Sequence, residues 1–121
     1  MEERDTMVAK KEQIPRDVKS EPMGGAGRLF MDRMSEVVTM PEVVKTFARA
    51  TLAPGSEVGY HIHHNDSEAY YILSGVGEYT EEGNVYRVGA GDVTYTPMGG
   101  GHGIKNVGQS NLEFIALILK V

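Results

Sequence analysis

The chain has 121 residues, enough for one domain, and 40% of them are apolar and 24% charged, an ordinary globular mixture. Its formal charge of -5 argues against a nucleic-acid partner, and the absence of cysteine excludes disulfides, thiolate zinc sites and cysteine nucleophiles. No apolar run reaches the roughly 18 residues that a membrane span needs, and residues 1–20 lack the apolar stretch of a signal peptide. We therefore expect a cytoplasmic protein.

The N-terminal part of the chain is polar and has no periodic apolar pattern. Residues 1–27 contain charges of both signs and end in the flexible turn Gly24–Gly27. Such a segment is either a frayed arm or one that packs on the outside of the domain or on a partner subunit. We therefore divide the chain into an N-terminal arm, residues 1–27, and a single β-barrel domain, residues 28–121.

From Arg28 onward the pattern predicts short strands separated by turns. The expected strands include 28–34, 47–52, 68–75, the two arms of a hairpin that turns at 82–84, 93–96 and 111–121. Residues 39–44 resemble a helix start but support one helical turn at most. Short strands with turn signals every ~8–12 residues indicate an all-β sandwich or barrel.

The last expected strand is apolar on both faces. One face contains Leu112, Phe114, Ala116 and Ile118, and the other contains Ile115, Leu117 and Leu119. An antiparallel strand with one face in water should be apolar on one face only. A second layer or another subunit must therefore cover the outer face, and we predict a homodimer. The alternative is that the N-terminal segment, particularly residues 28–34, folds across the barrel and covers the face itself.

All four histidines lie in two glycine-rich stretches. His61 and His63 are two residues apart, so on a strand both imidazoles point to one face. A turn after His63 can return Glu68 to the same face, whereas His102 has to arrive from a distant strand. Three imidazoles and one carboxylate suit Mn, Fe, Co, Ni or Zn and leave about two positions open on a six-coordinate metal. A histidine pair on a strand is common on protein surfaces, so the pair alone is weak evidence.

The spacing around these histidines resembles that of the cupin superfamily. The pattern G-x5-H-x-H-x4-E-x6-G is filled by Gly55, His61, His63, Glu68 and Gly75. The second pattern, G-x5-P-x-G-x2-H-x3-N, is filled by Gly91, Pro97, Gly99, His102 and Asn106. The resemblance covers about residues 45–119, and every position of both motifs is present.

This resemblance implies a double-stranded antiparallel β-helix, or jelly-roll barrel, with one divalent metal ion inside. The metal ligands of the family correspond here to His61, His63, Glu68 and His102. The metal itself (Mn, Fe, Ni, Co or Zn) is not identified by these residues.

Other residues near the motifs have ordinary explanations beside functional ones. Tyr70 and Ile72 share the parity of Glu68 and are candidates to line the cavity, although packing is the commoner role of such residues. Arg49 is a candidate to bind a carboxylate from within the cavity, although an outward arginine is favoured. His64 is expected to point away from the site, and Asn106 to brace a turn.

Two classes of function are compatible with these residues. The first is a metal-binding protein whose open coordination positions take a small oxygenated ligand such as a carboxylate or a sugar. The second is a metal-dependent enzyme, a dioxygenase or decarboxylase, or a sugar isomerase or epimerase, acting on a small oxygenated substrate. No acidic lid segment of the kind used in decarboxylation is evident, so we favour the first class.

Overall fold

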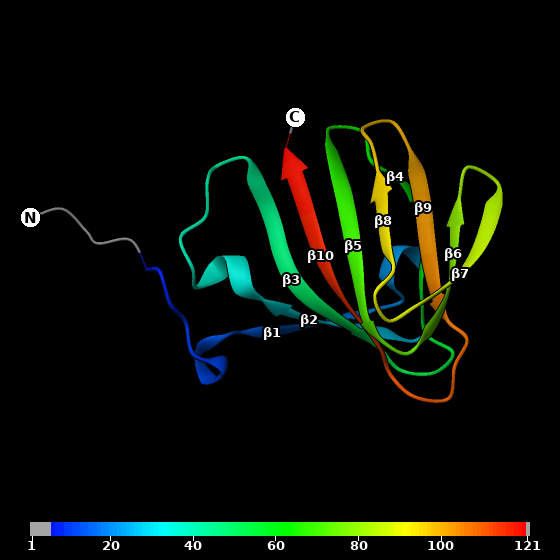
Figure 1. Ribbon diagram of the computed structural model, residues 1–121, viewed down its shortest axis with the longest axis horizontal. Coiled ribbons are helices and arrows are strands. Elements are labelled where there is room, and N and C mark those ends of the chain that lie inside the picture. Colours follow the sequence, from blue (N-terminus) through cyan, green and yellow to red (C-terminus); the bar gives the residue numbers. More distant parts are fainter. Residues whose placement is uncertain (1–5, 121) are drawn as a thin grey trace, which may run out of the picture.

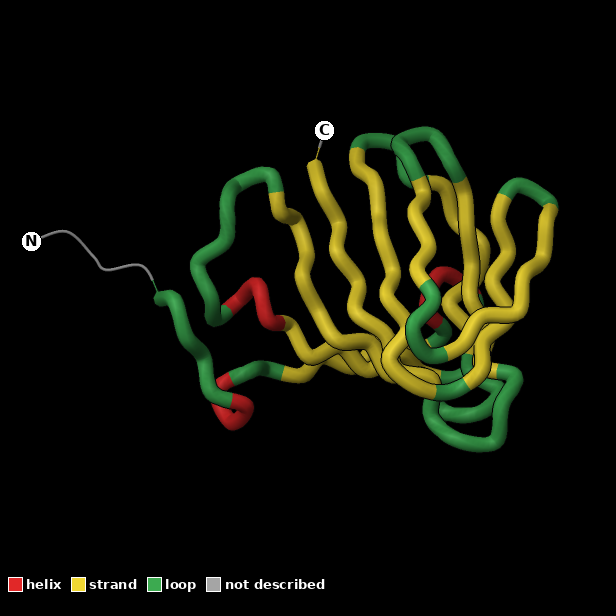
Figure 2. Tube along the Cα trace, viewed as in Figure 1, coloured by secondary structure: helices red, strands yellow, loops and turns green. Residues whose placement is uncertain are grey.

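The computed structural model describes residues 6–120, and most of them lie in β-strands (Figures 1 and 2). The strands are β1 (Arg16–Ser20), β2 (Arg28–Arg33), β3 (Val44–Leu52), β4 (Glu57–Ile62), β5 (Asp66–Ser74), β6 (Val76–Glu81), β7 (Asn84–Gly89), β8 (Val93–Thr96), β9 (Gly101–Asn106) and β10 (Leu112–Lys120). The helical segments are single 3-10 turns, η1 (Lys11–Gln13), η2 (Pro22–Gly24) and η3 (Met34–Glu36). No helix in residues 6–120 is long and apolar enough to cross a membrane.

The strands form two antiparallel sheets that face each other (Figure 1). One sheet has six strands in the order β1-β2-β3-β10-β5-β8, and the other has four in the order β4-β9-β6-β7. The all-β architecture expected from the sequence is therefore present. The hairpin expected at residues 82–84 is present between β6 and β7, and Glu82 and Gly83 form its two-residue turn with φ of 47° and 85°.

The core lies between the inner faces of the two sheets. On β3, Thr46, Ala48, Ala50 and Leu52 are buried and alternate with more exposed residues, as the sequence predicts. Phe114 on β10 pairs with Ala50 on one side and Ile72 on the other, and all three are buried. Strand β10 thus lies within the six-stranded sheet, between β3 and β5, and its apolar inner face packs in the core between the sheets.

Part of the expected N-terminal arm is a sheet strand. Residues 1–5 of the arm lie outside the described part of the chain, but β1 pairs with β2, and Arg16 makes an ion pair with Asp32 at 2.7 Å. Every residue of β1 is exposed, so no alternation of apolar and polar residues marks this strand in the sequence. The segment expected to contain at most one helical turn, residues 39–44, has only a turn closed by the amide of Val44 and the carbonyl of Pro41.

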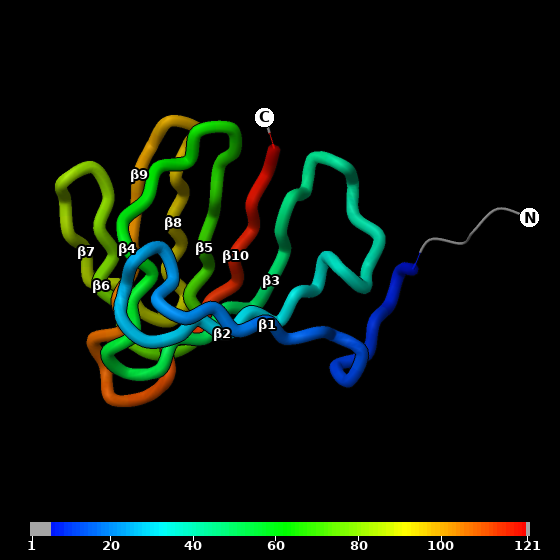
Figure 3. The backbone as a smooth tube through the Cα atoms, turned by 180° about the vertical axis from the view of Figure 1, so that it is seen from behind, coloured from blue at the N-terminus to red at the C-terminus, as the bar shows by residue number. Residues whose placement is uncertain are grey.

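The chain between β1 and β2 packs backbone against backbone on β4 (Figure 3). Glu21 and Met23 in this segment have left-handed φ values of 48° and 50°. A Cβ atom at Gly59 of β4 would overlap the carbonyl oxygen of Met23, and one at Gly25 would overlap that of Glu57. The two glycines are therefore required for this close approach.

We predict that Gly59→Ala destabilises the protein by about 1–3 kcal/mol, because the added methyl group has to displace the backbone of the N-terminal segment. Thermal unfolding measures the effect. Gly89→Ala is the matched control, because a Cβ there meets only an ordinary van der Waals neighbour, the carbonyl oxygen of Gly75 at 3.7 Å. Equal melting temperatures for both variants would show that the segment does not pack on β4 as described.

Candidate metal centre

His61 and His102 are direct neighbours across the four-stranded sheet. His61 lies near the end of β4 and His102 near the start of β9, and the register of the two strands pairs them. Their ring centroids are 4.8 Å apart. Hydrogen bonding of the strands therefore brings together two histidines that are far apart in the sequence.

His63 follows the end of β4 and is held by the loop that precedes β9. Its amide donates to the carbonyl of Gly100 at 2.9 Å, and its carbonyl accepts from the amide of Gly99 at 2.6 Å. Gly99 has a φ of +88°, which side-chain-bearing residues rarely adopt. Gly99 of the second motif and the adjacent Gly100 thus hold the backbone of His63 in the first motif.

Glu68 comes from the opposite sheet, on β5, where it pairs with Thr96 and Ile118. Its Oε1 atom lies 3.0 Å from Nε2 of His63 and 3.0 Å from Nε2 of His102. The cluster therefore bridges the two sheets. The structure brings all four expected ligands together, with one ligand atom of each within 4.8 Å of the others. His63, Glu68 and His102 are buried, and His61 is half-buried.

The ring nitrogens that do not face the cluster have their own partners. His61 Nδ1 donates to the carbonyl of Gly59 at 2.8 Å, and His63 Nδ1 donates to Oδ1 of Asp66 at 2.6 Å. His102 Nδ1 lies 2.8 Å from the hydroxyl of Tyr79 and 2.9 Å from that of Thr96. Each imidazole is held in place by a different part of the fold.

These bonds determine which atoms face the centre of the cluster. A carbonyl or carboxylate only accepts, so the proton of a neutral His61 or His63 ring is on Nδ1, and its Nε2 presents a lone pair. The Nε2 atoms of His63 and His102 are 3.0 Å apart, and the Glu68 carboxylate is equally close to both. The hydroxyls of Tyr79 and Thr96 can donate to Nδ1 of His102, which leaves the ring proton of His102 on Nε2, where it can be donated to Glu68. Without such a shared proton these acceptors repel one another unless a metal ion lies among them.

A transition-metal ion fits this donor set. Two ligand atoms that are each about 2.1 Å from one ion, and at right angles about it, are ~3.0 Å apart. The observed separations of 3.0 Å between His63, His102 and Glu68 match this spacing. The residues could therefore hold a metal ion.

Burial and hydrogen bonding shift the pKa values of the cluster in different directions. Burial lowers the pKa of His61, which favours its neutral, ligating form. The hydrogen bond with Glu68 raises the pKa of His63 in spite of burial. Burial acts to raise the pKa of Glu68, but the hydrogen bonds with His102 and His63 outweigh it and lower the pKa. The carboxylate is thus charged, as a metal ligand must be.

The remaining candidate residues lie in different places. Tyr70 is buried, stacks on His102 with centroids 5.0 Å apart, and lines a cavity of about 130 Å³ beside the cluster. Ile72 is buried in the core and is not among the residues that line this cavity. Arg49 lies on the outer face of β3 and pairs with Glu113, which is the outward position that the sequence favours over a role in the cavity. Strand alternation explains this, because Ala48 and Ala50 occupy the inner positions.

Two further residues lie outside the cluster. His64 is exposed and is not one of the four clustered residues, but it lines a surface depression together with His61 and His63. Asn106 is buried and braces a turn, since its Nδ2 donates to the carbonyls of Leu52 and Ser110 and its Oδ1 accepts from the amide of Gly108.

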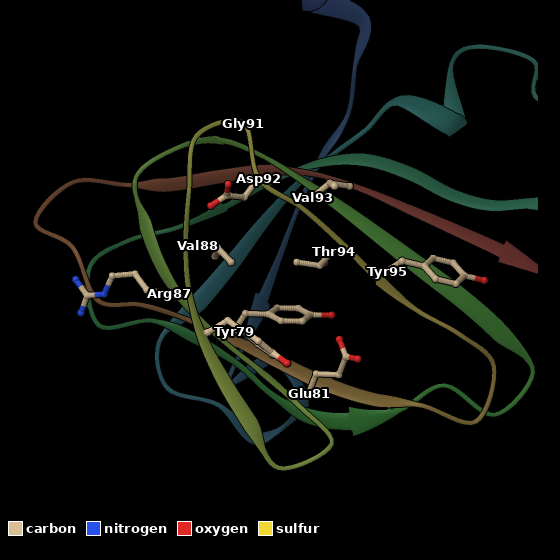
Figure 4. A pocket seen from close by; sticks show the side chains of 10 residues that line it. Tyr79, Glu81, Arg87, Val88, Gly91, Asp92, Val93, Thr94 and Tyr95 are labelled. Carbon is tan, nitrogen blue, oxygen red and sulfur yellow. The ribbon is translucent and has the colours of Figure 1, made fainter.

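Asp66, Tyr79 and Thr96, the side chains that hold the ligands, were not anticipated from the sequence. Asp66 is the one that local sequence spacing could have indicated, because a carboxylate three residues after His63 can reach back to its ring. Tyr79 also lines a second cavity of about 630 Å³ beside β7 and β8, from which Arg87 and Tyr95 point outward (Figure 4). Tyr79 and Thr96 come from strands whose neighbours in space are set only by the fold.

The family is shown by comparison with known proteins. Residues 48–118 match the family model of the cupin domain. The chain belongs to the cupin family. The jelly-roll fold implied by the two sequence motifs is therefore confirmed.

Cupins of known structure and name are similar over nearly the whole chain. The oxalate-binding protein of Thermotoga maritima is 38% identical over 119 residues, which is 98% of each protein. The crystal structure of a predicted oxalate decarboxylase from the same organism superimposes with a TM-score of 0.87 at 38% identity and covers 95% of this chain and 100% of its own. A putative sugar phosphate isomerase from Acidithiobacillus ferrooxidans shares the fold, with a TM-score of 0.75 at 24% identity over 96% of this chain and 76% of its own.

We predict that His61→Ala, His63→Ala and His102→Ala each sharply lower metal content, because three remaining ligands form a weaker and more hydrated site. His64→Ala is the matched control and should leave metal content unchanged. Elemental analysis of protein purified without a His-tag measures both. Loss of metal from the His64 variant alone would contradict the assignment.

We further predict that Asp66→Asn lowers metal affinity by about 10- to 100-fold, because the amide no longer supports His63 with a negative charge. Competition with a chelator of known affinity measures the change. Asp92→Asn is the control, because Asp92 only accepts a hydrogen bond from the amide of Gly89 in a surface turn. Unchanged affinity in Asp66→Asn would mean that the hydrogen bond to His63 has no part in metal binding.

Proposed function

We propose that this protein binds a divalent transition-metal ion through His61, His63, Glu68 and His102, and binds a small carboxylate, oxalate in the first instance, at the open coordination positions. The observation that carries the proposal is the convergence of three imidazoles and one carboxylate in one largely buried cluster. When bound, the metal supplies a Lewis-acid centre for ligand oxygen atoms.

The size of the adjoining cavity restricts the ligand. Its volume of about 130 Å³ equals that of about four water molecules at ~30 Å³ each. Apart from the cluster residues, Tyr70 and Lys19, its wall is apolar. Such a cavity suits a small planar acid better than a sugar. The name of the full-length Thermotoga relative, an oxalate-binding protein, supports the same ligand.

Isothermal titration of metal-loaded protein with oxalate tests the proposal. We expect oxalate to bind the metal-loaded protein but not the metal-free protein. Oxalate should also fail to bind the His102→Ala variant after incubation with the same metal. Glucose should bind none of these proteins. Equal oxalate binding with and without metal would contradict a metal-centred site.

Decarboxylation is the second candidate function, favoured by the name of the structural neighbour, a predicted oxalate decarboxylase. A decarboxylase must deliver a proton to the carbon atom that loses carbon dioxide. Glu68 is the only carboxylate among the described residues that line the inner cavity, and it is a proposed ligand. Burial, followed by the charge of Glu68, raises the pKa of Tyr70 well above 10, so its hydroxyl is a poor acid. These observations support binding over turnover, and release of formate from oxalate would reverse that choice.

We also propose that the protein is a homodimer. The outer face of the six-stranded sheet exposes aromatic and aliphatic side chains, among them Tyr71 at 50%, Tyr95 at 56% and Val93 at 71% exposure. The register places Tyr71 and Val93 in one row with Ile115, and Tyr95 in the next row with Leu117. Strand β2 extends the same sheet beside β3, so the part of the N-terminal segment in β2 does not cross the outer face. A second copy offers the same apolar rows to this face.

We predict a dimer mass in sedimentation equilibrium at micromolar concentration and a monomer mass for Tyr71→Lys, because a charge in the apolar row opposes association. Lys105→Met, on the other sheet, should remain a dimer. A monomer mass for the unmodified protein would rule out the dimer.

A further inference from the structure

The inner cavity opens into a wider depression at the protein surface, which we call the mouth. The mouth has a volume of about 460 Å³. Six residues line both spaces, Lys19, Met23, Met31, His61, His63 and Ile118. A ligand that approaches the cluster from solvent therefore passes these residues.

The charges of the mouth differ from those of the protein as a whole. Lys19, Arg33 and Lys45 line it, against one carboxylate, that of Asp66. The whole chain has a formal charge of -5. Local positive charge on an acidic protein indicates that the mouth takes an anion.

Lys19 differs from the other two cations in having no ion pair with any described residue. Arg33 lies 3.4 Å from Asp17 and 3.6 Å from Glu36. Lys45 lies 3.0 Å from Asp66. The charge of Lys19 is thus the one that remains available to a ligand.

The register of β1 explains why Lys19 reaches the mouth. Lys19 pairs with Leu29 of β2, whose side chain is buried toward the inner cavity. Paired residues of adjacent strands point to the same face of a sheet, so Lys19 faces the same way. The chain that follows is fixed on β4 by the contact of Gly25 and Gly59, which holds Met23 at the mouth as well.

We propose that Lys19 is a specificity-determining residue that attracts a small anion, preferentially a dianion, into the mouth of the metal cavity. The proposal rests on the metal-binding function proposed above, but not on oxalate as the ligand. Because the Coulomb attraction scales with ligand charge, removal of the ammonium weakens a dianion more than a monoanion and leaves a neutral ligand unaffected.

Anion titrations of the cobalt-substituted protein test this role, with the visible absorption of Co²⁺ as the readout. The probes are oxalate, azide and, at pH 8, neutral imidazole. The variants are Lys19→Met, which keeps the length of the side chain, and Lys19→Arg, which keeps its charge. Lys105→Met is the matched control, because Lys105 is an exposed lysine of β9 that lines neither space.

For Lys19→Met we expect oxalate binding to weaken on the order of 10-fold, azide binding to weaken less, and imidazole binding and cobalt content to stay unchanged. Lys19→Arg should retain most of the oxalate affinity, and Lys105→Met all of it. Added salt should reduce the difference between parent and Lys19→Met, because it screens the exposed charge.

Two results would overturn the role of Lys19. One is equal affinity of parent and Lys19→Met for both anions, and the other is an equal loss for imidazole and oxalate, which would indicate a structural effect. A parent protein that binds azide but not oxalate would refute oxalate as the ligand, and weaker azide binding by Lys19→Met would still support the role of Lys19.

Discussion

The site depends on holding three imidazoles and one carboxylate close together. Nε2 of His63, Nε2 of His102 and the Glu68 carboxylate approach to 3.0 Å, a distance that a shared proton or a metal ion stabilises. The fold fixes each ring through a contact to its Nδ1 atom. The free energy needed to bring the four side chains together is supplied by folding, so they are already in place when a cation binds.

The anchors come from separate elements, which makes the cluster a property of the whole barrel. The backbone of β4 holds His61, the start of β5 holds His63, and hydroxyl groups of β6 and β8 lie against His102. Only Glu68 among the four ligands comes from the six-stranded sheet. A shift of one sheet relative to the other would therefore separate the carboxylate from the imidazoles.

Small side chains leave the space beside the cluster. Ala50 of β3 and Ala116 of β10 line the inner cavity, and Ala48 pairs with Ala116. Larger side chains in these inner positions would fill the cavity, as side chains fill most protein interiors. The cavity is thus a consequence of alanines on strands that otherwise carry large residues such as Leu52 and Phe114.

The sequence predicts the parts of the site that depend on local spacing. His61, His63 and Glu68 follow from alternation and a turn, and the two glycine-rich motifs indicate that His102 joins them. The same alternation places Arg49 on the outer face of β3, as the sequence favours. Tyr79 and Thr96 could not be found in this way, since their contact with His102 depends on which strands become neighbours. Strand β1 was missed because none of its residues is buried.

The site is built from two separate regions of the chain, the barrel strands and the N-terminal segment. The barrel strands contain the ligands, whereas Lys19 and Met23 come from a short stretch that precedes the barrel and lies against β4. Substitutions in that stretch can change the surroundings of an entering molecule without moving an imidazole. Homologues with the same four clustered residues can therefore differ in ligand preference through a few N-terminal residues. The residues at positions 25 and 59 must both remain small, because the two backbones are in contact there.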